Sequence, residues 1–351
     1  MPRLLIDTKK IQHNVEVITT LLKNKGIESI FPVVKVFAGN PTFAQWMVSF
    51  GFDYLADSRI ENLKAFRFLP AKKVCLRVSA KSEIKALVRY VDLSLQSELE
   101  TIHLIQKEAL RQGKIHSIIL MFDLGDLREG IFFEANYLPI VQSILTFSHV
   151  RLLGIGTNLT CYGGVVPSLS NMNQLLHLKT TIENTFKISI PLVSGGNSSI
   201  FPLLQSGQLP QGINQVRVGE AFYFGRETAY GDSIDNTYRD TCLLEAEIIE
   251  CYEKPSYPIG EMTMDSFGNP PQIQDLGPIR RAILNIGKQD VWIENLFPVD
   301  PKVKILGGSS DHLIVYLKED HYKLGDKVLF YLNYPGLLQA NTSKYVKKVF
   351  L

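Results

Sequence analysis

The stretch VDLSLQSELETIHLIQKEALRQGKIHSIILMFD, residues 91–123, decides the fold class of this chain. Two short apolar runs, at 91–95 and 117–123, are typical of buried strands. The segment between them has helical periodicity and ends at Gly113, and the apolar residues along one side of it are Leu99, Ile102, Ile105 and Ala109. A strand, a helix and a second strand in this order predict one unit of a parallel sheet.

The same alternation continues over the first two thirds of the sequence. It predicts eight strands, at residues 30–36, 53–56, 73–78, 91–95, 117–123, 151–157, 188–194 and 214–218. Most of these runs are apolar without alternation, as expected for strands that are buried on both faces. We therefore predict an α/β protein with a (β/α)8 barrel, and an open, doubly wound sheet is the alternative.

The pattern changes near residue 236, where strands continue but the helical segments between them largely disappear. The further strands are predicted at 241–249, 281–286, 303–306, 313–317 and 327–331. Residues 252–279 contain five prolines and three glycines, which indicates a long loop. The predicted domains are a barrel at 8–235 and a C-terminal, mostly-β domain at 236–351, which residues 1–7 are also candidates to join.

Charge and apolar content limit the classes of partner. The 351 residues include 37 Lys and Arg and 35 Asp and Glu, which gives a formal net charge of +2. A duplex nucleic-acid binder normally has a strongly basic face, and a membrane-spanning helix needs about 20 apolar residues, so we expect neither partner. The four cysteines and seven histidines show no metal-binding spacing. We expect a cytoplasmic protein without a bound metal, whose thiols are reduced and mostly buried.

The first predicted strand carries a lysine, Lys35, inside its apolar run. Burying an unpaired ammonium group is costly, because burial depresses its pKa or demands a partner. This cost is acceptable for a lysine that forms a Schiff base or acts as a base in its neutral form. A salt-bridged barrel lysine accounts for the pattern equally well.

Other predicted strand ends carry polar groups, and catalytic residues of barrels lie at these ends. The segment SGGNSS (194–199) and the pair Gly219 and Glu220 have the glycines and helix starts that often hold phosphate, although a loop and a helix cap explain either alone. Arg217 stays charged wherever it is buried and needs a carboxylate, a phosphate or another acceptor. Mutual pairing is sufficient to explain the charged cluster at 123–130.

In order and combination, six segments resemble the pyridoxal-phosphate barrel racemases, which are the alanine racemase family, and most closely the ornithine/alanine racemase-like branch. They are VVKVFAGNP (33–41), LADSRIENL (55–63), FDLGDLREG (122–130), GIGTNLTCYGG (154–164), SGGNSS (194–199) and VRVGEAFYFGRETAYG (216–231). The resemblance extends over nearly the whole chain. It implies pyridoxal 5'-phosphate (PLP) as the cofactor.

The resemblance also implies roles for individual residues. Lys35 forms the internal aldimine with the cofactor and then acts as one of two acid/base groups, and Arg217 donates to the pyridine nitrogen. Because an arginine does not give up its proton, reprotonation at Cα is favoured over transamination. Arg128 matches an arginine near the phenolic oxygen of the cofactor. The family positions that bind the phosphate are Ser198, Gly219, Glu220 and Tyr334 in this chain.

Three positions depart from the alanine racemase pattern. Gly39 replaces a tyrosine at the phosphate, Asn158 replaces the histidine that stacks on the cofactor ring, and Lys288 replaces the tyrosine that serves as the second base. We predict Lys288 or Asp311 as the acid/base group on the opposite face of the substrate. Binding of a substrate carboxylate is the other role open to Lys288, and the other candidate bases are His312, Cys161 and Tyr162.

The resemblance implies an amino-acid racemase that prefers ornithine or another basic amino acid, with alanine as a further candidate substrate. The candidates for binding a distal ammonium group are Glu227, Asp265 and Asp275. In this family the second base comes from the neighbouring subunit, so a head-to-tail homodimer is expected. The alternatives are a PLP-binding homeostasis protein without racemase activity, which would be a single barrel, and a D-amino-acid lyase on the same fold.

Overall fold

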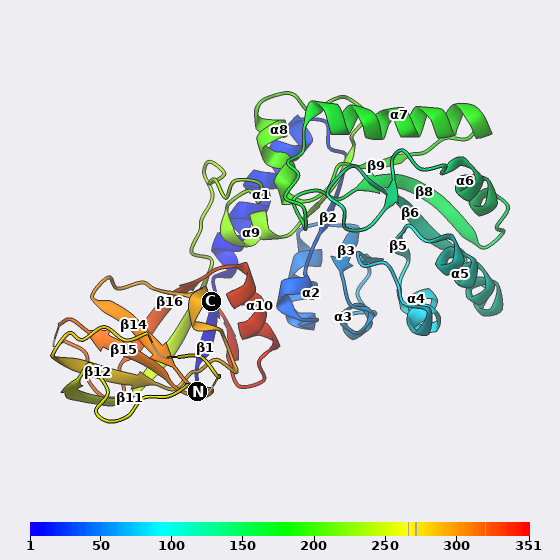
Figure 1. The fold of residues 1–351 in the computed structure, drawn as a ribbon. Coiled ribbons are helices and arrows are strands. Elements are labelled where there is room, and N and C mark those ends of the chain that lie inside the picture. Colours follow the sequence, from blue (N-terminus) through cyan, green and yellow to red (C-terminus); the bar gives the residue numbers. More distant parts are fainter. Residues whose placement is uncertain (266, 271, 320) are drawn as a thin grey trace. The chain divides into compact units, whose positions relative to one another are not determined.

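The chain divides into two compact units in the computed structural model, which describes residues 1–265, 267–270, 272–319 and 321–351. One unit comprises Gln12–Arg239, and the other combines Met1–Ile11 with Asp240–Leu351. The first unit is built on a parallel sheet and the second on a mostly antiparallel one (Figure 1). The predicted fold class, a (β/α)8 barrel followed by a mostly-β domain, is confirmed.

Eight parallel strands form the barrel. Hydrogen bonds join them in the order β2-β10-β9-β8-β6-β5-β4-β3, and a parallel bridge between Val33 and Ala56 connects the chain after β2 to β3. Each strand overlaps one of the eight predicted runs. Their bounds are β2 Ser29–Pro32, β3 Tyr54–Asp57, β4 Lys72–Cys75, β5 Leu93–Gln96, β6 His116–Asp123, β8 Val150–Thr157, β9 Leu192–Ser194 and β10 Gln215–Val218, and the short β7 Ile131–Phe132 pairs with β6.

Helices lie along the outside of the barrel strands (Figure 1). The helix predicted between 95 and 117 is α5, Leu99–Gln112, and it ends at Gly113 with a φ of 64°. Its buried side, which includes Ile102, Ile105 and Ala109, is the predicted one. The other helices before residue 240 are α1 Thr8–Asn24, α2 Pro41–Ser49, α3 Ile60–Ala65, α4 Ile84–Tyr90, α6 Leu138–Leu145, α7 Leu169–Phe186, α8 Phe201–Gln205 and α9 Glu220–Phe224, with 3-10 turns η1 Lys35–Phe37, η2 Lys81–Glu83 and η3 Ser198–Ile200.

Apolar side chains fill the interior of the barrel. A cluster of buried residues from five neighbouring strand segments consists of Phe31, Val33, Ala56, Val74, Leu93, Leu95, Ile119 and Met121. Burying one large apolar side chain stabilises the fold by about 1.5–3 kcal/mol relative to leaving it exposed. The barrel is therefore a packed core, and its polar chemistry is confined to the ends of the strands.

The first barrel strand is shorter than predicted. It ends at Pro32, and Lys35 begins the turn η1, Lys35–Phe37, instead of lying inside a strand. After the Val34 backbone N–H donates to Ala56 O at 2.8 Å, the chain turns through Ala38, whose φ is 48°. An apolar run alone does not distinguish a strand from the turn that follows it, so the prediction of a strand to residue 36 was wrong.

The second unit contains a sheet in the order β13-β16-β11-β12-β15-β14. The N-terminal strand β1 pairs antiparallel with β11 and parallel with β17. The strand bounds are β1 Arg3–Ile6, β11 Cys242–Pro255, β12 Pro278–Leu284, β13 Leu296–Pro298, β14 Val303–Gly308, β15 Leu313–Leu317, β16 Lys327–Leu332 and β17 Lys347–Phe350. The sequence did not predict helix α10, Tyr334–Thr342, or the short turn η4, Ile293–Asn295.

The loop predicted at 252–279 is shorter in the structure. Strand β11 continues to Pro255 and β12 begins at Pro278, and these two prolines are paired at the end of the ladder. Prolines were taken to exclude strands, but a proline is tolerated at the end of a strand, where its missing N–H is not needed. Residues 266 and 271 of this segment lie outside the described residues. Among the described helices, none has the length and apolar content needed to cross a membrane.

Candidate active site

Lys35 lies just beyond the carboxyl end of β2, at the end of the barrel where chemistry is expected. Lys35 is partly buried. Burial lowers the pKa of Lys35 and the charge of Arg128 lowers it further, whereas the charges of Cys161, Asp57 and Glu220 raise it. A lysine with a depressed pKa is more often neutral at pH 7, which is the form that attacks a carbonyl carbon or accepts a proton.

Arg217 is almost completely buried on β10, with 3% of its surface exposed. Its guanidinium donates to three neutral acceptors, which are Ser194 Oγ, Thr157 O at 2.7 Å and Asn158 Oδ1 at 3.3 Å. Burial lowers the pKa of Arg217 to about 10, so the group remains charged at neutral pH. The sequence predicted that Arg217 needs an acceptor, and the structure provides three uncharged ones. Because these groups do not neutralise the guanidinium, its positive charge remains available to a further acceptor.

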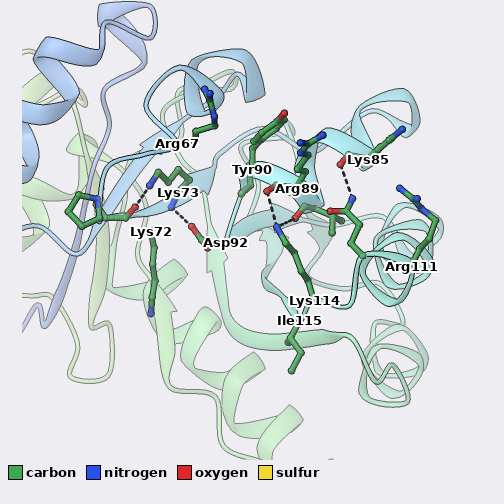
Figure 2. Close-up of a pocket in the computed structure, with 15 residues that line it drawn as sticks. Arg67, Lys72, Lys73, Lys85, Arg89, Tyr90, Asp92, Arg111, Lys114 and Ile115 are labelled. Atoms are coloured by element: carbon green, nitrogen blue, oxygen red, sulfur yellow. Dashed lines mark hydrogen bonds between the residues drawn. The ribbon is translucent and has the colours of Figure 1, made fainter.

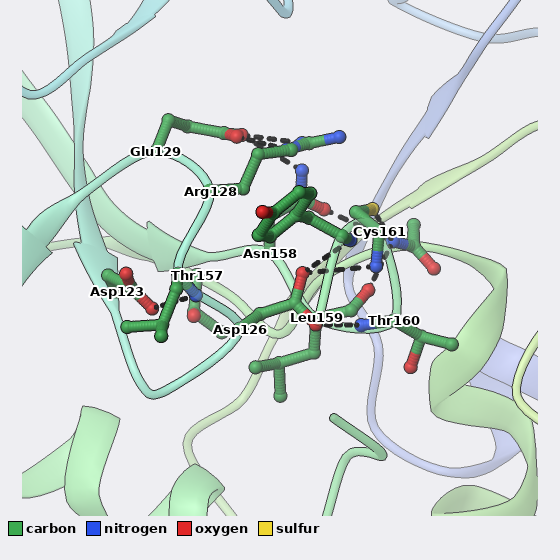
Figure 3. A network of polar contacts seen from close by, with 12 residues as sticks. Asp123, Asp126, Arg128, Glu129, Thr157, Asn158, Leu159, Thr160 and Cys161 are labelled. Atoms are coloured by element: carbon green, nitrogen blue, oxygen red, sulfur yellow. Dashed lines mark hydrogen bonds and ion pairs between the residues drawn. The ribbon is translucent and has the colours of Figure 1, made fainter. Parts of the chain in front are cut away.

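Arg217 belongs to a polar network that includes Asn158. Figure 3 shows the part of this network around Arg128, Glu129 and Asn158. Asn158 Oδ1 also accepts from Asn197 Nδ2 at 3.1 Å, and Asn158 Nδ2 donates to Glu129 Oε1 at 2.9 Å. Glu129 in turn pairs with Arg128, whose Nη2 donates to Oε1 at 2.6 Å. The predicted residues Arg128, Asn158 and Arg217 therefore belong to one network, which fixes the orientation of the Asn158 side chain.

The loop at residues 160–165 is organised by Asp126 (Figure 3). The Asp126 carboxylate accepts from four backbone N–H groups, those of Thr160, Cys161, Tyr162 and Val165, at 2.9–3.1 Å. Burial raises the pKa of Asp126, but these hydrogen bonds outweigh it, and the pKa lies below its usual value. The cluster at 123–130 is thus only partly self-paired, because Asp126 holds a loop more than thirty residues away in sequence.

The same loop places Cys161 differently from the prediction. All four cysteines are free thiols, as predicted, but only Cys75 and Cys242 are buried, and Cys161 is exposed. Its Sγ accepts from Asn197 Nδ2 at 3.2 Å. Desolvation of the sulfur raises the pKa of Cys161 against the charges of Arg128 and Arg217. The expectation of mostly buried thiols therefore does not hold for Cys161, because its apolar neighbours in sequence belong to a loop.

The segments after β9 and β10 come together, as the sequence indicated. Ser198, which is 3% exposed, accepts from the Ala221 backbone N–H at 3.3 Å through its Oγ. Gly219 approaches Val33 so closely that a Cβ would lie 3.1 Å from Val33 Cβ and 3.2 Å from its carbonyl oxygen. Glu220 Oε1 accepts from Arg226 Nη2 at 2.8 Å. These contacts bring backbone N–H groups and a serine hydroxyl to the end of the barrel that carries Lys35.

Two buried hydroxyl groups at this end of the barrel have no hydrogen-bond partner among the described residues. They are Thr157 Oγ1 and Ser199 Oγ. Leaving a buried polar group unsatisfied costs about 1–3 kcal/mol, so such atoms are uncommon and often belong to a site that binds something. Thr157 O accepts from Arg217, so one of the two hydroxyls belongs to a residue that contacts the buried guanidinium.

Asn62 packs against Gly39, the position at which the resemblance implies a tyrosine in other members of the family. A Cβ on Gly39 would lie 2.8 Å from Asn62 Oδ1 and 3.0 Å from Asn62 Cα, and the φ of Gly39 is 74°. Asn62 Nδ2 donates to both carboxylate oxygens of Asp57, at 3.1 and 3.2 Å. Asn62 thus links Gly39 to Asp57, whose charge is close enough to Lys35 to raise the pKa of that lysine.

Replacing Gly39 by alanine is expected to lower the free energy of unfolding by about 2–3 kcal/mol, because strain from the positive φ adds to the clash with the Asn62 backbone. The matched control is Gly26→Ala, whose φ is 84° but whose Cβ would meet nothing within 4 Å. That control should cost only about 1 kcal/mol. Urea unfolding of both variants measures the difference, and equal losses would contradict the close approach of Asn62.

Asp57 gives the barrel a stability that depends on pH. Burial raises the pKa of Asp57 to about 6, against the lowering effects of the Arg59 and Ser58 backbone N–H groups, Asn62 and the charge of Lys35. The pKa of Asp57 is higher in the folded protein than the value of 3.8 expected in the unfolded chain, so folding favours the protonated carboxyl group. The resulting contribution to stability is complete below pH 3.8 and is lost as the pH rises through about 6. From pH 4 to pH 7 the loss amounts to about 2 kcal/mol.

The measurement is urea unfolding of the wild-type protein and of Asp57→Asn at several pH values. We expect the wild type to lose about 2 kcal/mol relative to the variant between pH 4 and pH 7, because asparagine does not titrate. A difference between the two proteins that stays constant over this range would show that Asp57 is ionised normally in the folded state.

The remaining predicted residues, Lys288, Asp311 and Tyr334, belong to the β-rich unit. Lys288 Nζ lies 3.9 Å from Asp265 Oδ2 and 4.0 Å from the centroid of the Phe267 ring. Its side chain is 9% exposed. The segment 287–290 packs on 309–312, with Lys288 N donating to Ser309 O at 2.9 Å. Lys288 and Asp311 therefore belong to adjoining segments, and the Gln289 side chain donates to Asp311 Oδ1. Tyr334 is partly buried and begins α10.

The acidic residues considered for a distal ammonium group differ in their surroundings. Glu227 is 2% exposed, and its carboxylate accepts from the backbone N–H groups of Ala229, Tyr230 and Asp232 at 2.6–2.9 Å. Asp275 accepts from Gly277 N at 2.9 Å. Asp265 faces Lys288, and its pKa is lowered by backbone hydrogen bonds from Asn269 and Phe267 and by the charge of Lys288. The sequence also did not predict that the Lys288 ammonium group lies over the Phe267 ring.

The family model for "Alanine racemase, N-terminal domain" matches residues 6–227, which is more than half of the chain. The chain belongs to the alanine racemase family. The chain is 42% identical over 352 residues to an ornithine racemase of Acetoanaerobium sticklandii, covering 100% of this chain and 99% of the relative. It is 36% identical to a lysine racemase of Thermotoga maritima, over 99% of this chain and 98% of the relative. The family and branch named from the sequence are therefore confirmed.

Solved structures of the alanine racemase family share the fold. A structure of alanine racemase from Bartonella henselae with covalently bound pyridoxal phosphate is matched with a TM-score of 0.75 and 19% identity. The match covers 100% of this chain and 99% of the other. At this identity the comparison shows the fold of this alanine racemase family member alone, and the function of the site depends on the residues that this chain itself carries.

Several residues of the network were absent from the sequence-based site. Asp57, Glu129 and Asn197 each contact or influence a predicted residue, but they had been assigned no role. Asp57 and Asn197 share a signal that local reading can detect, since each is an Asp or Asn whose side chain accepts from the backbone N–H two residues later. Their contacts with the other site residues involve segments that are distant in sequence, and no local pattern predicts such contacts.

Proposed function

We propose that this protein is a PLP-dependent racemase that interconverts the L and D enantiomers of a basic amino acid, with ornithine preferred and alanine a poorer substrate. The observation that carries the proposal is the full-length similarity to racemases of basic amino acids, together with Lys35 and Arg217 at one end of the barrel. A lysine with a lowered pKa and a buried arginine are the chemical groups that such a reaction needs.

The residues at this end of the barrel suit PLP. Lys35 would hold it covalently, and Arg217 would donate to its pyridine nitrogen with an N–H that its neutral partners leave available. Ser198 and the backbone N–H groups of Gly219 and Glu220 would bind its phosphate, and Arg128 and Asn158 would lie at its ring. Tyr334, which belongs to the β-rich unit, is a further candidate for binding the phosphate. The unpartnered hydroxyls of Thr157 and Ser199 support a polar ligand at this position. When bound, PLP withdraws electrons from Cα of the attached amino acid and so acidifies its proton.

The protein supplies two acid/base groups for that proton. Lys35 would remove it or return it on one face of Cα, and the permanent charge of Arg217 favours return of the proton at Cα itself. Lys288 is our proposed group for the opposite face, with Asp311 as the alternative. In Lys288, contact with both a carboxylate and an aromatic ring fixes the ammonium group, so a single position of Nζ is favoured.

We further propose a homodimer in which the β-rich unit of one subunit completes the site of the other. The opposite-face group must approach Cα from the side away from Lys35, and Lys288 belongs to a different compact unit from Lys35. Sedimentation velocity of the PLP-loaded protein should give the mass of a dimer. Full racemase activity from a stable monomer would contradict this part of the proposal.

The experiment that tests the function uses the purified, PLP-loaded protein with single L-amino acids, namely ornithine, lysine, alanine and threonine. Chiral chromatography should detect D-ornithine and D-lysine at the highest rates, with slower formation of D-alanine. Release of an aldehyde or a keto acid instead would indicate a lyase. Bound cofactor with no conversion of any substrate would indicate a PLP-binding protein without racemase activity.

A further inference from the structure

A basic hollow lies at the amino ends of three barrel strands, β4, β5 and β6, where α3, α4 and α5 end (Figure 2). Its volume is about 1150 Å³. Seven of its lining residues are basic, and they are Arg67, Lys72, Lys73, Lys85, Arg89, Arg111 and Lys114. Asp92 is the one acidic residue among those that line it. The chain as a whole carries a net charge of only +2, so the hollow concentrates positive charge locally.

Most of this charge is not neutralised by carboxylates. Arg111 pairs with Glu108, with Nη2 to Oε1 at 2.5 Å. Within the described part of the chain, the other six basic residues have no carboxylate oxygen within 4.0 Å of their charged nitrogens. Asp92 itself uses a carboxylate oxygen to accept from the Lys73 backbone N–H at 2.7 Å. Lys73 is buried, and its Nζ donates to Leu69 O and Ala71 O. The hollow therefore presents the positive charges of the other lysines and arginines that lack a carboxylate partner to one volume.

Backbone carbonyl groups hold some of these side chains in place. Lys114 Nζ donates to Arg89 O at 2.9 Å and to Val88 O at 3.3 Å, at the end of α4 (Figure 2). Arg67 Nη1 donates to Lys64 O at 3.0 Å. A helix C-terminus carries only about half of a negative charge, so these contacts orient the cations without neutralising them. The side chains of Lys85 and Arg89 on α4 are exposed and stay available.

We propose that the basic hollow binds a small polyanion that carries two or more adjacent phosphate groups. Several cations that face one concave volume favour a compact ligand of high charge, because each phosphate oxygen accepts a charge-assisted hydrogen bond. Arginine contributes the planar donor pair that matches phosphate. Arg67 and Arg89 line the hollow without a carboxylate partner, whereas Arg111 pairs with Glu108. Duplex nucleic acid fits less well, because its backbone needs basic residues along an extended surface and not in one depression.

This hollow is separate from the Lys35 end of the barrel. It lies beside His116, where β6 begins, whereas the other end of β6, at Asp123, leads into the loop that carries Arg128 and Glu129 of the active-site network. Eight residues of strand span about 26 Å. A ligand in the hollow therefore does not occupy the PLP phosphate site, and the inference stands independently of the proposed racemase activity.

The test uses the PLP-loaded protein, so that the cofactor phosphate site is filled, and inorganic tripolyphosphate as the probe. Isothermal titration calorimetry at low salt should show one site, with an affinity that falls steeply as salt is added. The double variant Lys85→Glu with Arg89→Glu should bind tripolyphosphate at least about tenfold more weakly. Both side chains are exposed on α4, and circular dichroism of the variant confirms that it folds.

The matched control reverses two exposed lysines of the β-rich unit, Lys344→Glu with Lys347→Glu, which changes the net charge by the same amount. Unchanged tripolyphosphate affinity in this control, with loss in the α4 variant, supports the hollow as the site. Equal losses in both variants, unchanged binding in the α4 variant, or no binding at low salt would overturn the proposal. Tighter binding of a single-stranded RNA that tripolyphosphate does not displace would also overturn it.

Discussion

Replacing Lys35 by alanine is expected to lower kcat/KM for ornithine racemisation by more than about 10³-fold, because the same side chain holds the cofactor and moves the proton on one face. The fold should tolerate the change, since Lys35 lies in a turn beyond the end of β2 and not within the strand. Chiral chromatography after incubation with L-ornithine measures the activity. Borohydride treatment should fix the cofactor to the wild-type protein and not to the variant.

The matched control is Lys64→Ala, which removes an exposed lysine from α3 in the same unit. It should keep full activity and the borohydride-reducible chromophore. Partial restoration of Lys35→Ala activity by added methylamine would distinguish a missing amine from a damaged fold. A Lys35→Ala protein that is still fixed by borohydride at this site would refute the assignment of Lys35.

Replacing Lys288 by glutamine is expected to lower the racemisation rate by about 10²–10⁴-fold, because one of two acid/base groups is lost. Proton exchange need not stop, since Lys35 still serves its own face. In D₂O, solvent deuterium should therefore enter Cα of one enantiomer of ornithine, while the other enantiomer exchanges slowly. Proton NMR of the Cα position in each enantiomer measures this asymmetry.

Two further variants sharpen the test of Lys288. Lys302→Gln removes an exposed lysine of the same unit and should leave both exchange rates unchanged. Asp311→Asn should have a smaller effect than Lys288→Gln if Lys288 is the acid/base group. Two-way exchange at wild-type rates in Lys288→Gln, with one-way exchange in Asp311→Asn, would transfer the role to Asp311.

The barrel was predictable from the sequence because its signals are local and repeated. The run at 117–123 is apolar without alternation, and the structure shows β6 buried along nearly its whole length, as expected for a strand covered on both faces. Gly113 ends α5 in the left-handed conformation that favours glycine, so this helix boundary was also predictable from the sequence. The β-rich unit was predicted less completely, since β13 and β17 are short and α10 follows Asn333 with few apolar residues to mark it.

The parts of the site that could not be predicted depend on contacts between distant segments. The position of Cys161 follows from Asp126, whose carboxylate holds the backbone of residues 160–165. The surroundings of Lys35 include Asp57, whose pKa of about 6 results from burial that no neighbouring residue in sequence reveals. Individual residues such as Arg217 were identified from the cost of burying a charge, whereas their partners were not.

The loop between β11 and β12 shows why proline content misled the prediction. Pro255 and Pro278 lie opposite each other at the end of the ladder, so neither removes a hydrogen bond from the middle of the sheet. Between them, Asp265 and Phe267 reach Lys288. The loop therefore sets the environment of the proposed second acid/base group, a role that its composition alone did not indicate.

The most direct test of the account is the approach to equilibrium from both sides. The PLP-loaded protein is incubated separately with pure L-ornithine and pure D-ornithine, and the enantiomers are followed by chiral chromatography. A racemase has an equilibrium constant of one, because enantiomers have equal free energies in water, so both reactions should converge on equal amounts with total ornithine unchanged. Loss of total ornithine, or no interconversion by a protein that retains PLP on Lys35, would contradict the account.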